Sequence, residues 1–242
     1  LGADVHTAAE VLQAEAIRLI ALGRPADAAT VLERAAGMIK AKGLKQEYVA
    51  PVQPWLATAL RSELAACPPW SPRYRQLARR ARRAAAKARH IARNYPNNRP
   101  HALRESALLA AMAGRPRRAR RLFEDSLEVA ERQGARHEHA QTLLARGLTG
   151  LDLGWPDASS EVARARQALA HAVLPAHAAD PERDVHHADE LVDGDSAVAA
   201  AVPDAGDDAR RAGGRDGRGG RRRREGRRAS ECIERIAGEE GV

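Results

Sequence analysis

The sequence predicts an all-α protein in which about four antiparallel helix pairs (residues 1–175) are followed by a disordered tail (residues 176–242). The first observation behind this is composition: hydrophobic residues make up 44% of the chain, but aromatic residues only 3%. Ala and Leu dominate the apolar set and favour helices, whereas strands favour β-branched and aromatic side chains. The second is apolar spacing at three- and four-residue steps, and the third is an internal repeat.

Prolines and glycines mark the expected helix ends in order along the first 175 residues. Thr7 and Glu10 have the spacing of a capping box at the start of the first helix. Later starts are predicted by prolines that suit a first helical turn, at Pro25, Pro72, Pro100, Pro116 and Pro156. Gly43 and Gly134 stand where a glycine ends a helix. Helices are therefore expected at 5–22, 25–42, 46–66, 72–93, 100–113, 116–133, 137–153 and 157–173.

The last 67 residues have a different composition. All seven aromatic residues lie between Tyr48 and Trp155, and the tail divides into an acidic block at 180–208 and a basic, glycine-rich block at 210–228. Such a segment buries too little apolar surface to offset its chain entropy, which predicts disorder. The tail consists largely of Ala, Arg, Gly and Asp, and the alternative interpretation of this narrow composition is a spurious or out-of-frame extension.

Two segments of the chain repeat one another. "GRPADAATVLERAAGMIKAKG" (23–43) and "GRPRRARRLFEDSLEVAERQG" (114–134) both open Gly-Arg-Pro and close on glycine. Repeated helical pairs predict a solenoid, in which each pair buries its apolar face against its neighbours. The equivalent positions are Ala28 and Ala119, Leu32 and Phe123, and Ala35 and Ser126.

This repeat resembles the tetratricopeptide repeat (TPR) family, whose pattern has a turn glycine followed by Ala five, a large apolar residue nine and a small residue twelve positions later. The pattern also has a small residue seven and a large residue eleven positions before the glycine. Ala16 and Leu12, Ala107 and Leu103, and Gly147 and Leu143 fit these positions. A third unit after Gly154 has Ser159 and Ala163 in place, but Arg166 where a small residue belongs.

The resemblance implies a TPR-like α-solenoid that acts as a non-catalytic, cytoplasmic interaction module. The long spacing from Gly114 to Gly154 is similar to the TPR regions of bacterial regulatory ATPases and sensor kinases, which implies a part in signal transduction. The expected partner is a protein, a peptide, or neighbouring ATPase or kinase domains of a larger chain. The family's groove positions, carried over to this chain, are Gln13, Ile17, Ile20, His101, Arg104, Leu108, Gln141, Leu144 and Leu148.

A strongly basic helix is predicted at residues 73–93, where nine Lys or Arg and no acidic residue occur. An apolar seam through Leu77, Ala81 and Ala88 makes this helix amphipathic, so its charges form either a solvated outer face or a surface for anions. The alternative function is therefore nucleic-acid or polyanion binding through this helix and the arginines of 210–228. The basic face comprises Arg79, Arg80, Arg82, Arg83, Lys87 and Arg89.

Other chemistries lack their sequence signals. No GxxxxGK[ST] phosphate loop occurs, and Cys67 and Cys232 stand far apart without CxxC spacing. His137 and His139 are two residues apart and do not share a helix face. No apolar run approaches the roughly 18 residues that a membrane span needs. We therefore expect no cofactor, no metal, no membrane partner and no catalytic centre.

Overall fold

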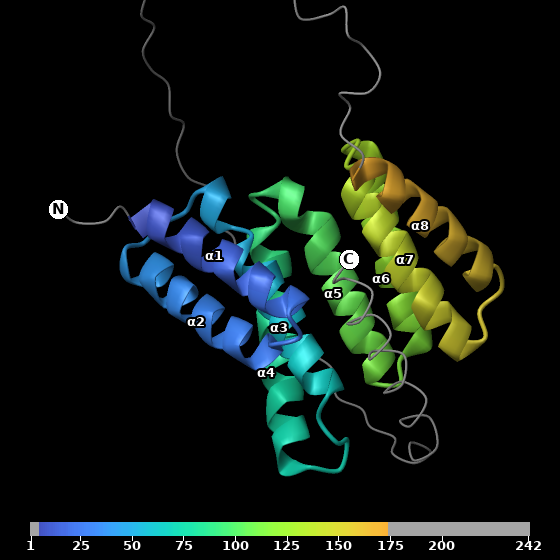
Figure 1. Ribbon diagram of the computed structural model, residues 1–242, viewed down its shortest axis with the longest axis horizontal. Helices are drawn as coiled ribbons and strands as arrows, with labels where there is room; N and C mark the ends of the chain where they lie inside the picture. Colours follow the sequence, from blue (N-terminus) through green and yellow to red (C-terminus); the bar gives the residue numbers. More distant parts are fainter. Residues whose placement is uncertain (1–4, 174–242) are drawn as a thin grey trace, which may run out of the picture. The chain divides into compact units, whose positions relative to one another are not determined.

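The computed structural model describes residues 5–173, and this range is all-helical, as predicted (Figure 1). The tail predicted to be disordered, 176–242, lies outside the described residues. No helix within the described range is both long and apolar enough to cross a membrane. The α-helices are α1 (Val5–Ala21), α2 (Pro25–Ala41), α3 (Val52–Ala65), α4 (Pro72–Ile91), α5 (Arg99–Met112), α6 (Pro116–Arg132), α7 (Arg136–Leu153) and α8 (Ala158–Val173).

Most helix ends agree with the sequence prediction to within two residues, and the main exception is the third helix. Instead of starting at residue 46, the chain forms a short 3₁₀ turn, Glu47–Val49, and α3 begins at Val52. Pro51 and Pro54 explain the delay, because proline lacks an N–H and fits only the first turn of a helix. The capping box at Thr7 is also wrong, because α1 already begins at Val5 and Thr7 lies inside its first turn.

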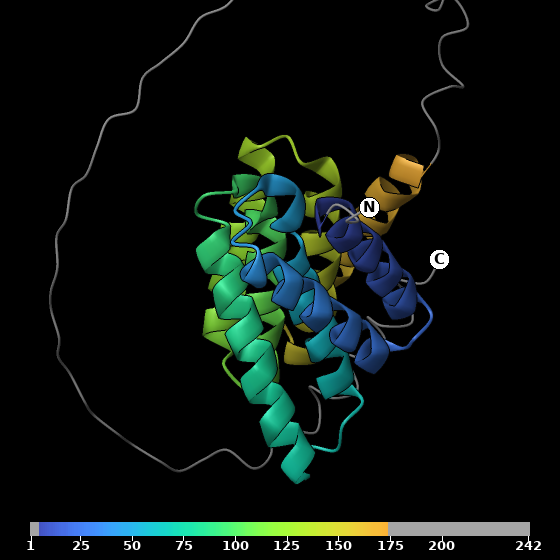
Figure 2. The ribbon, with the colours of Figure 1, turned by 90° about the vertical axis from the view of Figure 1, so that its left-hand side faces the viewer.

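Consecutive helices pack against one another as hairpins (Figures 1 and 2). In addition, each odd-numbered helix contacts the next odd-numbered one, so that α1 packs on α3, α3 on α5, and α5 on α7. The buried apolar residues form one large cluster over α1–α4 that also includes Leu109, and a second over α5–α8 that also includes Ala65. Met112 packs against both clusters and joins them. A small third cluster, of Ala88, Ala92 and Ala102, lies between α4 and α5.

The two Gly-Arg-Pro segments form equivalent corners. Gly23 and Gly114 have φ of +69° and +66°, a left-handed conformation that glycine adopts without steric cost. Arg24 (φ −111°, ψ 57°) and Arg115 (φ −119°, ψ 64°) precede the helical prolines with nearly the same backbone. The N–H of Arg24 donates to the Leu19 carbonyl at 2.8 Å, and the N–H of Arg115 donates to the Ala110 carbonyl at 3.0 Å.

The matched side chains of the two repeats are also buried alike. All six positions after the corner glycines are fully buried. The small residues before the corners, Ala16 and Ala107, are fully buried too. The six buried positions that follow Gly23 and Gly114 are Ala28, Leu32, Ala35, Ala119, Phe123 and Ser126.

The third unit is shifted by one residue from the register that the sequence suggested. Ser159, Ala163 and Arg166 are exposed, and the buried residues are Ala158, Val162 and Ala165. The cause lies in the corner, where Trp155 packs edge-on against Phe123 with ring centroids 6.4 Å apart. Asp157 then takes a positive φ of 66°, so that α8 begins at Ala158 and Pro156 precedes the helix instead of lying in its first turn.

Candidate interaction surfaces

The predicted groove residues lie on three odd-numbered helices, but they are not equally accessible. On α1, the side chains of Gln13, Ile17 and Ile20 are half-buried. The Oε1 atom of Gln13 is enclosed and accepts no hydrogen bond within the described part of the chain. On α5, His101, Arg104 and Leu108 are buried. On α7, Gln141 and Leu144 are half-buried, whereas Leu148 is buried.

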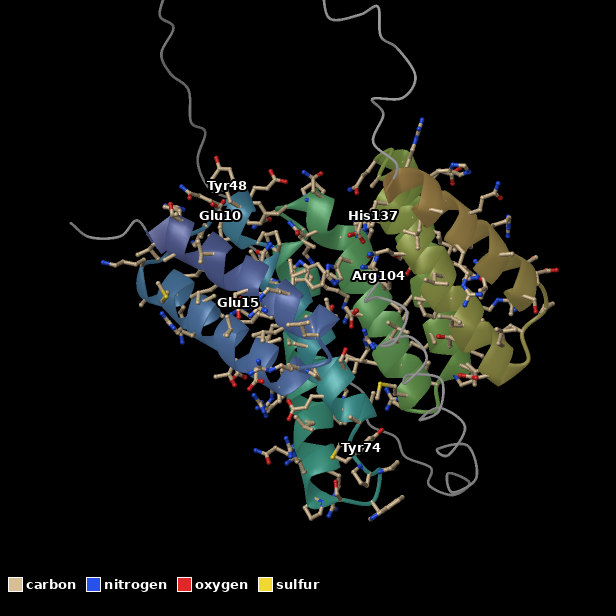
Figure 3. The ribbon with its side chains drawn as sticks, in the orientation of Figure 1. Glu10, Glu15, Tyr48, Tyr74, Arg104 and His137 are labelled. Carbon is tan, nitrogen blue, oxygen red and sulfur yellow. The ribbon has the colours of Figure 1, made fainter. Side chains whose placement is uncertain are left out.

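Arg104 links two of the predicted groove helices (Figure 3). Its guanidinium donates from α5 to Glu138 and, at 2.8 Å, to Oε1 of Gln141, both on α7. The Nη1 atom also lies 3.4 Å from the Thr142 hydroxyl. The structure thus brings Arg104 and Gln141 together. Arg104 reaches α7 with several donors of one planar group, which fixes the spacing between the two helices.

A second cross-helix ion pair, which the sequence analysis missed, joins α3 to α5. Arg61 Nε donates to Glu105 at 2.7 Å, and both side chains are almost completely buried, with 1% and 2% exposed. A buried pair of this kind contributes little net stability, but removal of one partner leaves an uncompensated charge. The available sequence signal was the placement of single charged residues within otherwise apolar helical stretches.

His101 stands beside these ion pairs as a neutral packing residue. Its Nε2 lies 2.9 Å from the Thr58 hydroxyl, and its ring packs edge-on against Trp55 at 4.8 Å between centroids. Burial lowers the pKa of His101 well below its usual value, and the charges of Arg104 and Arg61 lower it further. The imidazole is therefore uncharged at neutral pH.

The predicted basic face is a largely solvated surface of α4. Arg79, Arg82, Arg83 and Lys87 are exposed, and Arg89 is half-buried. Arg80 pairs with Glu33 of α2 at 2.7 Å. The seam beneath them is buried as the amphipathic pattern predicts, through Leu77, Ala81, Ala84, Ala85 and Ala88.

Two adjoining cavities lie where α4 passes α5 and the start of α6. The first, of about 230 Å³, is lined by arginines from two helices: Arg82 and Arg89 of α4, and Arg115 and Arg118 at the start of α6. The second, of about 420 Å³, shares Arg82, Leu109 and Ala113 with the first and has a mainly apolar floor. The sequence analysis missed Arg115 and Arg118, although "GRPRR" at a helix start was visible in the sequence.

Comparison with protein-family models, curated proteins and solved structures found no match to this chain. Among residues 5–173, no group of three or more His, Cys, Asp or Glu side chains is placed to hold a metal ion.

Proposed function

We propose that the helical region is a TPR-like α-solenoid that acts as a non-catalytic protein-interaction module. The observation that carries this proposal is the equivalence of the two Gly-Arg-Pro corners, which share backbone conformation, hydrogen bonds and the burial of matched side chains. Contacts limited to neighbouring hairpins and successive odd-numbered helices are the packing that a solenoid requires. The proposed setting is the cytoplasm of a bacterium, beside the ATPase, kinase or regulator domains of a signalling protein.

In this proposal the predicted groove residues divide into two groups with different roles. Gln13 and Ile17 on α1 and Gln141 and Leu144 on α7 are accessible enough to contact a peptide directly. Arg104 instead positions α7 against α5 through Glu138 and Gln141.

Peptides selected from a displayed random library against the full chain provide a test that needs no known partner. Binding of the selected peptides, measured by fluorescence anisotropy, should weaken by about tenfold in Gln13→Arg and in Ile17→Arg, because a longer charged side chain obstructs the groove. Gln167→Arg, the same change at an exposed position on α8, is the matched control and should leave the affinity unchanged. Equal affinities in all three variants would contradict the proposal.

A second candidate function, polyanion binding by the α4 face, is supported by charge. Among the described residues, Arg80 is the one member of this face that forms an ion pair with an acidic side chain, Glu33. A gel-shift titration with DNA at increasing salt tests it, because phosphate contacts by Arg79, Arg83 and Lys87 would give a steep salt dependence. Affinity that does not change with salt, or that survives Arg79→Glu with Arg83→Glu, would exclude this candidate.

A further inference from the structure

The 230 Å³ cavity between α4, α5 and the start of α6, named here the arginine pocket, concentrates positive charge, with no acidic residue of the described part of the chain in its lining. Four arginines line it together with the Ser106 hydroxyl, and none of its lining residues is acidic. Its floor consists of small and aliphatic side chains, which leave the guanidinium groups as its main polar groups. The floor residues are Ala85, Ala86, Leu109, Ala110 and Ala113.

Arg89 shows that this charge is poorly compensated within the described residues. Its Nε atom is enclosed and makes no hydrogen bond there. Burial lowers the pKa of Arg89, and repulsion from Arg118 and then Arg93 lowers it further. Neither Arg115 nor Arg118 forms an ion pair with a described acidic residue. The pocket is therefore lined by positively charged side chains that form no ion pair with a described acidic residue, and an anion would offset their charge.

The pocket lies beside the start of α6, where Arg115 and Arg118 line it. This 17-residue helix opens with Pro116, has no acidic residue in its first turn, and receives no side-chain cap from its N-cap residue, Arg115. The first N–H groups of a helix lack intrahelical acceptors, and the helix dipole makes this end favourable for anions. Helix end and arginines therefore favour the same ligand charge.

We propose that the arginine pocket binds the phosphomonoester group of a phosphorylated peptide that lies along α4. A phosphomonoester carries close to two negative charges at neutral pH and presents three acceptor oxygens, which suits converging guanidinium groups. A peptide fits the rest of the site, because the pocket shares Arg82, Leu109 and Ala113 with the 420 Å³ cavity, which is also lined by Leu64, Ala78 and Met112. Arg75 and Arg89 mark the ends of this combined groove; their separation along α4 is roughly 21 Å, the length of about six extended residues.

A nucleic-acid backbone suits this site less well. Each phosphodiester carries one charge, and a strand runs over a surface instead of projecting a single group into a recess. Tyr74 is the one aromatic side chain that lines either cavity, so a row of stacking platforms for bases is lacking here. The pocket also uses none of the predicted groove residues on α1, α5 and α7, so its failure and that of the proposed groove can be told apart.

The test uses the full 242-residue chain and a fluorescent pool of hexapeptides with a central phosphoserine and varied flanking residues. The same pool with serine, inorganic phosphate and a single-stranded DNA are measured beside it. We expect the phosphoserine pool to bind about tenfold more tightly than the serine pool, since charge-assisted contacts to phosphate are among the strongest hydrogen bonds. The combined change Arg89→Ala and Arg118→Ala should remove this preference.

Matched variants distinguish the loss of a pocket contact from a general loss of positive charge and from misfolding. Arg117→Ala removes one charge from the same helix end but lines neither cavity, so it should leave the preference intact. The double variant relieves repulsion, and its melting temperature should equal or exceed that of the wild type. If the double variant unfolds, the single change Arg115→Ala at an exposed lining position replaces it, and it should weaken the preference for the phosphoserine pool. Equal binding of both pools, an equal loss in Arg117→Ala, tighter binding of the DNA, or binding of inorganic phosphate without any peptide preference would each overturn the proposal.

Discussion

Single polar residues among apolar neighbours decide how the odd-numbered helices are joined. Arg61, His101 and Arg104 each form a bond to a side chain on another helix, at Glu105, Thr58 and Glu138. Sequence periodicity assigns such residues to a face but does not identify their partners, because the partner lies about 34 to 44 residues away on a different helix. The family pattern assigned His101 and Arg104 to a groove, whereas their burial indicates a positioning role.

The depressed pKa of His101 makes the stability of the fold depend on pH. Well above pH 6.5 the imidazole is neutral in both the folded and the unfolded chain, so this residue adds no pH dependence there. As the pH falls below 6.5, His101 becomes protonated in the unfolded chain but stays neutral in the folded chain. The free energy of unfolding therefore decreases as the pH falls. At pH 5.5 the loss from this residue is on the order of 1 kcal/mol.

Urea unfolding at pH 7.5, 6.5 and 5.5 measures this loss. His101→Asn should be less stable at every pH, because it disturbs the packing on Trp55, yet its stability should fall by less between pH 6.5 and pH 5.5. If wild type and variant lose the same free energy over this interval, the histidine is protonated in the folded state and the argument from burial fails.

At the scale of elements, the sequence predicted the helices well because their ends are set locally. Glycines with positive φ close α2 and α6 at Gly43 and Gly134, where they were expected. The error at the last helix occurred where a distant contact competes with a local signal. The packing of Trp155 on Phe123 accompanies the late start of α8, and no pattern within residues 154–166 shows that contact.

The same substitution at two glycines of the first hairpin should have opposite effects. Gly23 has φ +69° with nothing within 4 Å of an added Cβ, so Gly23→Ala should destabilise by about 1 kcal/mol through backbone strain alone. Gly37 lies exposed inside α2, also with open space, so Gly37→Ala should stabilise by about 0.5–1 kcal/mol. Thermal and urea unfolding measure both, and a stabilising Gly23→Ala would show that the corner can relax out of its left-handed conformation.

At the scale of the whole described region, packing is confined to neighbouring hairpins. The core divides into a cluster over α1–α4 and a cluster over α5–α8, joined through few side chains such as Leu109 and Met112. In such a stack, the free energy of unfolding is close to the sum of the contributions of single hairpins and of the interfaces between neighbours. A defect in one terminal hairpin should therefore unfold that end of the stack more readily than the other end. The sequence repeat alone could not predict this division of the core. The second hairpin, α3 and α4, lacks the corner glycine of the repeat, so its packing against the neighbouring hairpins is known only from the structure.

Gly147→Ala creates such a defect at one end. An added Cβ would lie 2.8 Å from Cγ2 of Val162 and 3.0 Å from the Ala158 carbonyl, so α7 and α8 must separate, at a cost of about 1–3 kcal/mol. Amide hydrogen exchange should then accelerate in α7 and α8 and stay at wild-type rates in α1 and α2. Gly23→Ala is the matched change at the opposite end and should give the reverse distribution. Uniform acceleration along the described helices in either variant would mean that both clusters unfold as one cooperative unit, because coupling through α3, α5 and Met112 then exceeds the local cost of opening a hairpin.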